Sequence, residues 1–277
     1  MIDLDRFTRE NWDRIRYSSY RMTGSILDAE DLAQEIMLRA VEMGSTLGEI
    51  PDHPEWIQIT SAETALALLR GRKSLPMDEF DLPDPIQTEG PGAAKGKISP
   101  AGDTSQTGVL LQFLFPLQYM TPEQRVTLVL RDGNEDGDRL AATALGMTFP
   151  EIYEIVDKAK ARYLEVRKQW GENIPFTFFE EEEGADKVFR RFIEILQLRD
   201  RALLQLLLWD RAELLAQSER RSGQDFVTMA CFELLERAGA EARFTPLWLN
   251  GCRGLLCWQR SGADWERWAA LLVICNG

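Results

Sequence analysis

Residues 22–35, which read MTGSILDAEDLAQE, decide the fold of the N-terminal part of the chain. Apolar residues recur in and after this stretch at the spacing i, i+3, i+4 and i+7: Ala29, Leu32, Ala33, Ile36 and Ala40. This periodicity is typical of an amphipathic helix that buries one face. We expect Asp28 to cap the helix, with Asp31 three residues later in an approximate capping box.

The opposite face of this helix carries polar residues around a single leucine. Asp31, Gln34, Glu35 and Leu38 again follow the spacing i, i+3, i+4 and i+7. Carboxylates beside an exposed leucine suit contact with a helix of another protein. The same pattern also suits a solvated surface, and the residues alone leave both interpretations open.

Composition excludes several classes of protein. The net charge is −13 and His53 is the single histidine, so a histidine triad or a multi-histidine metal site is not expected. The four cysteines form no CxxC pair, which favours buried, reduced thiols and no metal or cofactor. No apolar run approaches the length of a membrane span, and the N-terminus has no signal-peptide core, so we expect a cytoplasmic protein.

Composition and periodicity divide the chain into four segments. Residues 1–75 are predicted to be helical, with a second helix from Pro54 to about Gly71. Residues 76–108 contain five prolines and five glycines and carry more acidic than basic groups, which predicts a mobile acidic linker. None of the four segments is basic overall, whereas nucleic-acid binding normally leaves a basic footprint.

Residues 109–170 are predicted to contain a helix-turn-helix. Thr121-Pro122-Glu123 is typical of a helix start, with a cap, a proline and an acid in the first turn. A short helix from Asp138 to Leu145, the turn residue Gly146 and a long helix from Pro150 to about Trp170 follow. This order of short helix, tight turn and longer helix is the helix-turn-helix pattern.

Residues 171–277 are predicted to form an α+β domain. Helices are expected at 185–200, 201–216 and 225–238, followed by strands at 244–249, 255–259 and 265–274. Asn-Gly and Ser-Gly pairs separate the strands, as hairpin turns do. Helices followed by an antiparallel meander favour the α+β class.

Several of these stretches together resemble extracytoplasmic-function (ECF) sigma factors, the promoter-recognition subunits of bacterial RNA polymerase. Residues 22–35 are similar to their conserved region 2, and residues 55–73 to the last helix of that region. Residues 120–131 and the helix-turn-helix resemble region 4. The tail, with Leu249-Asn250-Gly251 before a strand, is similar to the SnoaL-like (NTF2-like) extension of one subgroup.

This resemblance implies a mostly α protein with a region 2-like domain (1–75), a linker (76–108), a region 4-like domain (109–170) and a SnoaL-like α+β domain (171–277). It implies no catalysis, binding to core RNA polymerase through region 2, and contact with promoter DNA through regions 2 and 4. The implied polymerase-binding residues are Asp28, Glu30, Asp31, Gln34, Glu35 and Leu38. The implied DNA-binding residues are Trp56, Arg70, Arg72, Lys73, Lys158 and Arg162.

Two alternatives stay open. Glu151, Glu154 and Asp157 begin the exposed face of the second helix of the helix-turn-helix, where such helices normally meet base edges. These acids favour a divergent interaction protein that has lost promoter recognition. The other alternative is a small-molecule-binding or cyclase-like function of the tail. Its pocket would include Trp209, Asp210, Trp248, Asn250 and Trp258.

Overall fold

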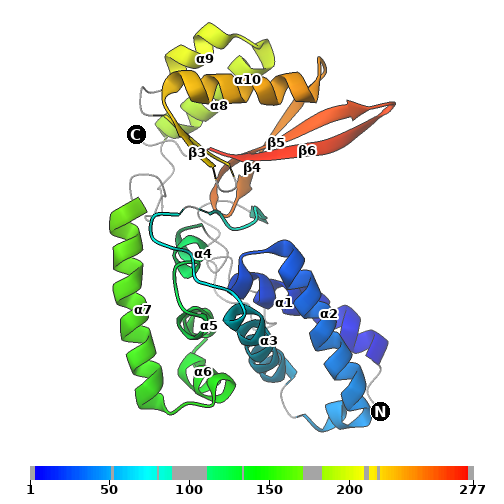
Figure 1. Cartoon of the computed structure of the whole chain (residues 1–277). Coiled ribbons are helices and arrows are strands. Elements are labelled where there is room, and N and C mark those ends of the chain that lie inside the picture. The colour runs from blue at the N-terminus through cyan, green and yellow to red at the C-terminus, as the bar shows by residue number, and fades with distance from the viewer. Residues whose placement is uncertain are drawn as a thin grey trace. The chain divides into compact units, whose positions relative to one another are not determined.

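The structure is a computed structural model that describes residues 4–50, 53–79, 81–88, 111–132, 134–170, 183–208, 212–216 and 219–273. The chain separates into two compact units. The first unit holds the helices up to residue 170, and the second holds the C-terminal helices and strands together with a short strand from the linker. Figure 1 shows the helices of the first unit from blue to green.

The N-terminal helices of the first unit are α1 (Leu4–Thr23), α2 (Ile26–Met43) and α3 (His53–Arg70), with the 3₁₀ helix η1 (Gly44–Glu49) before α3. The apolar face predicted for α2 is buried. The predicted cap was wrong, because Ser25 is the N-cap and its hydroxyl accepts a hydrogen bond from the Asp28 amide at 3.4 Å. The helix starts earlier because the amide of Ile26 also has an acceptor, the Asp84 carboxylate at 2.7 Å.

The later helices of the first unit are α4 (Leu111–Leu117), α5 (Pro122–Arg131), α6 (Gly137–Leu145) and α7 (Phe149–Trp170). The predicted start of α5 is confirmed as a capping box between Thr121 and Gln124. Gly146 takes a left-handed conformation and ends α6. The short helix α6, this turn and the long helix α7 form the predicted helix-turn-helix.

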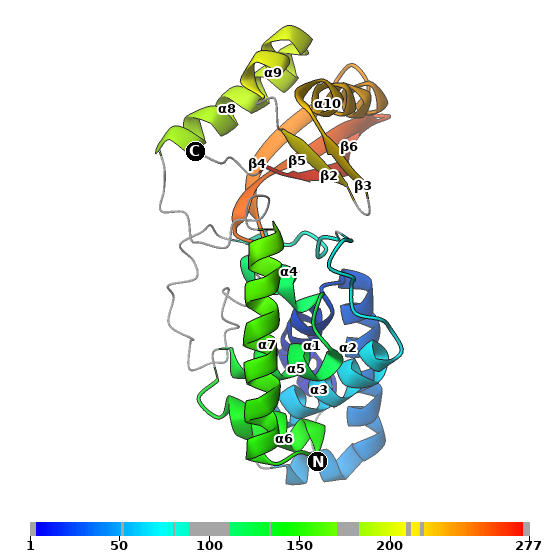
Figure 2. The ribbon, with the colours of Figure 1, turned by 60° about the vertical axis from the view of Figure 1, so that its left-hand side comes forward.

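The two groups of helices pack against each other in the first unit. Helix α3 contacts α5 and α6, and α1 contacts α5. Figure 2 shows α1 to α3 beside α4 to α7. Ile15 and Ile36 of the first group are fully buried, as are Phe115 and Tyr119 near α4. Each buried large side chain stabilises the unit by about 1.5–3 kcal/mol.

The second unit combines helices with an antiparallel sheet. Its helices are α8 (Glu183–Leu198), α9 (Arg201–Leu207) and α10 (Gln224–Ala238). Strands β4 (Arg243–Leu249), β5 (Cys252–Ser261) and β6 (Asp264–Leu272) form the predicted meander, in the sheet order β1-β4-β5-β6. Strands β2 (Glu213–Ala216) and β3 (Glu219–Ser222) form a separate hairpin.

Two local predictions were wrong. The helix predicted over 201–216 ends at Leu207, and residues 213–216 form β2 instead. A leucine-rich run is compatible with a helix or a strand. Here residues 213–216 form a strand because they pair with β3. The linker was predicted to be mobile, but Gln87–Thr88 forms β1 and pairs with β4. Backbone hydrogen bonding to an existing sheet edge offsets the entropy cost of ordering this segment.

The sheet of the second unit buries one face. Leu255 and Cys257 of β5 form a core with side chains from the helices, among them Phe192 and Ile195 of α8, Leu204 of α9, and Cys231 and Leu235 of α10. Figures 1 and 2 show the helices on one side of β4, β5 and β6. Because side chains alternate along a strand, Leu256 and Trp258 point to the opposite face.

Three thiols of the second unit should react slowly, because Cys231 and Cys257 are buried and Cys252 is half-buried. Burial raises the pKa of Cys231 to about 11, of Cys252 to about 12 and of Cys257 to about 11. Because the thiolate is the nucleophile, we expect iodoacetamide at about pH 8 to label native Cys275→Ser protein at least about a hundredfold more slowly than the urea-unfolded chain. Mass spectrometry of the labelled peptides measures this, and equal rates in both states would contradict the burial of these thiols.

Candidate functional site

The outer surface of α2 carries a row of exposed apolar side chains. Leu27 is 74% exposed, Leu38 62% and Val41 52%. Asp31 and Gln34 lie between Leu27 and Leu38 on the same surface. The five residues in order are Leu27, Asp31, Gln34, Leu38 and Val41, and successive members are alternately four and three positions apart. This is the spacing at which one helix packs along another in a coiled coil. We call these five residues the α2 outer row.

The structure brings four of the six predicted polymerase-binding residues onto this surface. Asp31, Gln34, Glu35 and Leu38 are exposed, and Glu35 pairs with Arg39 one turn later at 2.7 Å. The sequence reasoning missed Leu27 and Val41. Their heptad-like spacing from Leu38 is the signal that could have found them.

The other two predicted residues make contacts within the unit. The carboxylate of Asp28 accepts hydrogen bonds from both terminal nitrogens of Arg72, at 2.6 and 2.8 Å. Glu30 lies 3.5 Å from Arg16 of α1. Asp28 therefore joins the start of α2 to the end of α3, and it is not part of the α2 outer row.

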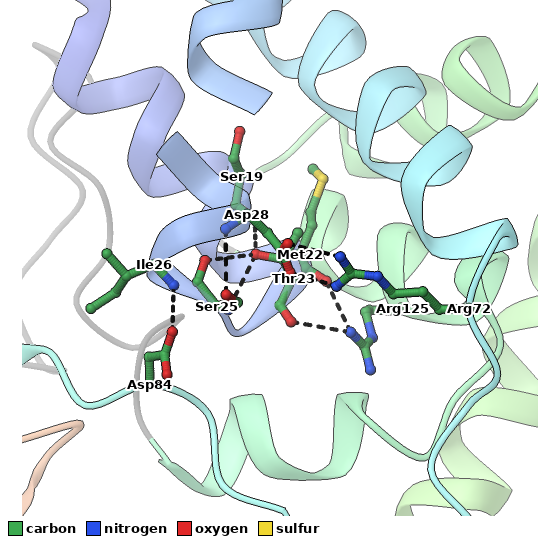
Figure 3. Close-up of polar contacts among 9 residues, drawn as sticks. All are labelled: Ser19, Met22, Thr23, Ser25, Ile26, Asp28, Arg72, Asp84 and Arg125. Carbon is green, nitrogen blue, oxygen red and sulfur yellow. Dashed lines mark hydrogen bonds and ion pairs between the residues drawn. The ribbon is translucent and has the colours of Figure 1, made fainter. Parts of the chain in front are cut away.

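The turn between α1 and α2 is held by the linker, as Figure 3 shows. The carboxylate of Asp84 accepts a hydrogen bond from the Ile26 amide, and its own amide donates to the Gly24 carbonyl at 2.8 Å. The hydroxyl of Tyr20 donates to the Asp84 carbonyl at 2.5 Å. An acid at this position also favours the N-terminus of α2 electrostatically.

Arg125 of α5 holds the other side of the same turn (Figure 3). Its guanidinium donates to the carbonyls of Met22 and Thr23 at the end of α1, and to the carbonyl of Leu117 at 2.7 Å. Burial lowers the pKa of Arg125 to about 10, and the charge of Arg72 acts in the same direction. Helix α5 therefore supplies a cation that caps the C-terminus of α1.

Three of the four predicted DNA-binding residues near α3 have partners inside the unit. Arg70 pairs with Glu123 of α5 at 2.9 Å, and Arg72 pairs with Asp28. Trp56 packs against the ring of Phe7 in the core. Lys73 is exposed.

A bidentate ion pair joins the two groups of helices. Arg139 of α6 donates to both carboxylate oxygens of Glu55 of α3, at 2.8 and 2.9 Å. These hydrogen bonds lower the pKa of Glu55. Since the pKa is lowered on folding, the pair stabilises the packing above the ordinary carboxyl pKa, and this contribution is lost as the pH falls through the lowered value.

On α7 the predicted cations are largely paired. Lys158 is exposed and lies 3.8 Å from Glu154. Arg162 is half-buried and donates to the Tyr119 carbonyl at 3.0 Å and to Glu165 at 2.9 Å. The start of the exposed face also presents Phe149, Tyr153, Glu151 and Asp157. This end of the helix is acidic and aromatic.

The structure does not bring the predicted pocket residues of the tail together. Trp209 and Asp210 lie outside the described residues. The register of β4 and β5 places Trp248 and Trp258 on opposite faces of the sheet. Asn250 is buried, and its side chain accepts a hydrogen bond from the Ile86 amide at 3.1 Å, so it holds the linker beside the β4–β5 turn.

The described part of the chain lacks two further kinds of feature. No helix there combines the length and apolar character needed to cross a membrane. The same residues contain no cluster of three or more histidine, cysteine or acidic side chains arranged to hold a metal ion.

Comparisons with known proteins give a sequence relative and a structural match. No protein-family model matches the chain. The chain is 28% identical over 163 residues to the ECF RNA polymerase sigma factor SigG of Mycobacterium tuberculosis, in strains CDC 1551 / Oshkosh and ATCC 25618 / H37Rv alike. The match covers 53% of this chain and 44% of that protein, so the chain spans less than half the length of these curated relatives.

A solved structure extends the likeness to the tail. The crystal structure of Mycobacterium tuberculosis extracytoplasmic function sigma factor SigJ matches with a TM-score of 0.56 at 20% identity, over 93% of this chain and 84% of that chain. By sequence, the chain is homologous over 163 residues to SigG, an ECF sigma factor. Its fold is that of SigJ, with helical sigma domains and a SnoaL-like C-terminal domain, as the sequence predicted.

Proposed function

We propose that this chain acts in transcription initiation as a sigma factor of the ECF type. The α2 outer row binds core RNA polymerase, and α3 together with the helix-turn-helix contacts promoter DNA. The SnoaL-like domain modulates these contacts. The observation that carries the proposal is the α2 outer row, because exposed apolar side chains at heptad-like spacing favour a partner helix.

Promoter contact requires the α3 cations to change partners. Arg70 pairs with Glu123 and Arg72 with Asp28. Exchange of Glu123 for a phosphate therefore goes with separation of α3 from α5, and exchange of Asp28 with separation of the end of α3 from α2. Exposed ion pairs are weak, typically below about 1 kcal/mol each, so binding to polymerase can supply the free energy for this exchange.

The polymerase contact can be tested on the α2 outer row. We expect Asp31→Ala with Leu38→Ser to weaken binding to core RNA polymerase at least about tenfold, because the exposed leucine and the carboxylate beside it are removed. Both side chains are exposed, so the fold should persist. Co-elution with core RNA polymerase on a sizing column, at a series of protein concentrations, measures the effect.

The matched control is Leu206→Ser on α9, where a leucine that is 81% exposed undergoes the same change on a different surface. Its binding should equal that of the wild type. If the double variant of α2 binds polymerase as well as the wild type, the α2 outer row is not the contact.

One observation favours a second candidate, a sigma-like interaction protein without promoter recognition. The exposed start of α7 presents Glu151, Glu154 and Asp157 beside Phe149 and Tyr153. Hydrogen bonds from Thr148 lower the pKa of Glu151, which keeps this carboxylate ionised. Footprinting of the polymerase complex on DNA separates the candidates, since protection upstream of a start site supports promoter recognition and its absence supports the second candidate.

A further inference from the structure

One face of the sheet in the second unit carries arginine and tryptophan side chains. The register aligns Arg243 of β4 with Trp258 of β5, and Trp258 with Arg267 of β6. Arg260 and Trp265 are aligned two residues further along the β5–β6 hairpin. Side chains alternate along β4 and β5, so Arg243, Trp258 and Arg260 lie on the face opposite the helices. A register shift beside Cys257 and Trp258 interrupts the alternation on β6, and the pairing beyond it brings Trp265 and Arg267 onto the same face, where they contact Arg243 and Trp258. We call these five residues the Arg–Trp face.

Contacts within the Arg–Trp face fix its rings. The guanidinium carbon of Arg243 lies 3.8 Å from the centroid of the Trp265 ring. The guanidinium carbon of Arg267 lies 5.8 Å from the Trp258 ring. The indole N–H of Trp258 donates to the Thr245 hydroxyl at 3.0 Å. The indoles are therefore held upright on the sheet by cation–π contacts and a hydrogen bond.

The charge of this face is opposite to that of the chain as a whole. Arg260 pairs with Glu241 at 2.5 Å. Arg243 and Arg267 are exposed, and among the described residues neither has a carboxylate within ion-pair distance. Asp264 and Glu266 are aligned with Ser261 and Gln259, which places both acids on the other face of the hairpin. Two guanidinium groups are thus available to an anion in a chain of net charge −13.

We propose that the Arg–Trp face binds single-stranded nucleic acid. Arg243 and Arg267 lie two strands apart, which is about 10 Å, with Trp258 between them. An indole flanked by guanidinium groups suits a base that stacks on the ring while neighbouring phosphates meet the cations. If a second copy of this chain packed its own Arg–Trp face against this one, arginines would face arginines and repel each other. Charge complementarity therefore favours a polyanion as the partner.

The proposal goes beyond the helical contacts with polymerase and promoter DNA, because it uses only the second unit. Fluorescence anisotropy of the full chain with a labelled oligothymidylate at low salt tests it. We expect Arg243→Ala with Arg267→Ala to weaken binding at least about tenfold. The slope of log affinity against log salt should fall by about 1.4, since each lost phosphate contact with a single strand is worth about 0.7.

The control is Arg190→Ala with Arg201→Ala, which removes two exposed arginines from α8 and α9 and changes the net charge equally. Its affinity should match that of the wild type. The proposal is overturned if the wild type does not bind the oligomer, if both double variants bind alike, or if sedimentation shows a wild-type dimer that Arg243→Ala with Arg267→Ala converts to a monomer.

Two further measurements distinguish this proposal from the proposed polymerase and promoter contacts. Thermal melting of the Arg–Trp face variant should follow that of the wild type, because both changed side chains are exposed. Its co-elution with core RNA polymerase should also be unchanged. Loss of oligomer binding with intact polymerase binding therefore assigns the effect to this face, and loss of both with a lowered melting temperature overturns the assignment.

Discussion

Asp132→Asn is expected to lower the free energy of unfolding of the first unit by about 3 kcal/mol. Asp132, directly after α5, accepts a hydrogen bond from Arg21 of α1 at 2.5 Å. The Arg21 side chain is only 10% exposed and also lies against the ring of Phe113. Burial lowers the pKa of Arg21, and the charge of Asp132 acts in the opposite direction.

The large effect is expected because the substitution leaves the buried guanidinium of Arg21 without a compensating charge. An asparagine keeps the size of the side chain but removes the charge that compensates a buried guanidinium. Removing one member of a buried ion pair costs about 3–5 kcal/mol, and the partial exposure of Asp132 places this case near the lower end. Because Arg21 and Asp132 belong to different groups of helices, the packing of α1 against α5 should weaken most.

Urea denaturation followed by far-ultraviolet circular dichroism measures the loss. The matched control is Glu10→Gln, which removes the charge of a carboxylate 2.7 Å from Arg6 in a pair whose side chains are both more than half exposed. Surface pairs of this kind contribute little, so the control should change stability by less than about 0.5 kcal/mol. Equal losses for the two variants would show that the burial of Arg21 does not make its partner important.

Much of the fold could be predicted because it depends on local signals. The apolar residues from Ala29 to Ala40 indicate the buried face of α2 without any knowledge of its neighbours. Thr121 and Pro122 favour a helix start whatever the helix packs against, because the hydrogen bonds of the cap are made within one turn. Gly146 and the Asn250-Gly251 turn likewise depend on the backbone conformation of one or two residues.

The candidate site was less predictable because its contacts join residues far apart in the sequence. Arg70 and Arg72 end a helix, which is compatible with phosphate contact, but nothing local predicts pairing with Glu123 and Asp28. The strand β1 is equally nonlocal, because Gln87 lies in a proline-rich segment and pairs with Leu249 of the last domain. Part of the α2 outer row could be predicted from the sequence, because all of its residues lie on one helix and follow its periodicity.

These nonlocal contacts have a functional consequence. Arg70, Arg139 and Arg21 all join the group of helices α1 to α3 to the group α4 to α7 through carboxylates. One of these cations, Arg70, is also proposed to meet promoter phosphates, and it thus stabilises a packed arrangement of the two groups. In the proposed function this arrangement competes with DNA, and binding to polymerase through the α2 outer row shifts the balance.

Gly137→Ala is expected to destabilise the helix-turn-helix by about 3 kcal/mol. A Cβ atom at Gly137 would lie 2.5 Å from the Cα of Arg131 and 2.8 Å from the carbonyl oxygen of Leu130. Both atoms belong to the backbone of α5, so no side chain can move aside to make room. The start of α6 would have to shift away from α5, and overpacking that moves the backbone costs about 1–3 kcal/mol or more.

Gly146→Ala is the matched control, because it makes the same change in the same motif for a different physical reason. Nothing lies within 4 Å of a Cβ at Gly146, but its φ of +65° is unfavourable for alanine. That strain costs roughly 1–2 kcal/mol, so Gly137→Ala should lower the midpoint of urea denaturation clearly more than Gly146→Ala. The reverse order would mean that α5 and α6 can separate freely, and the close approach at Gly137 would then not be what positions the helix-turn-helix.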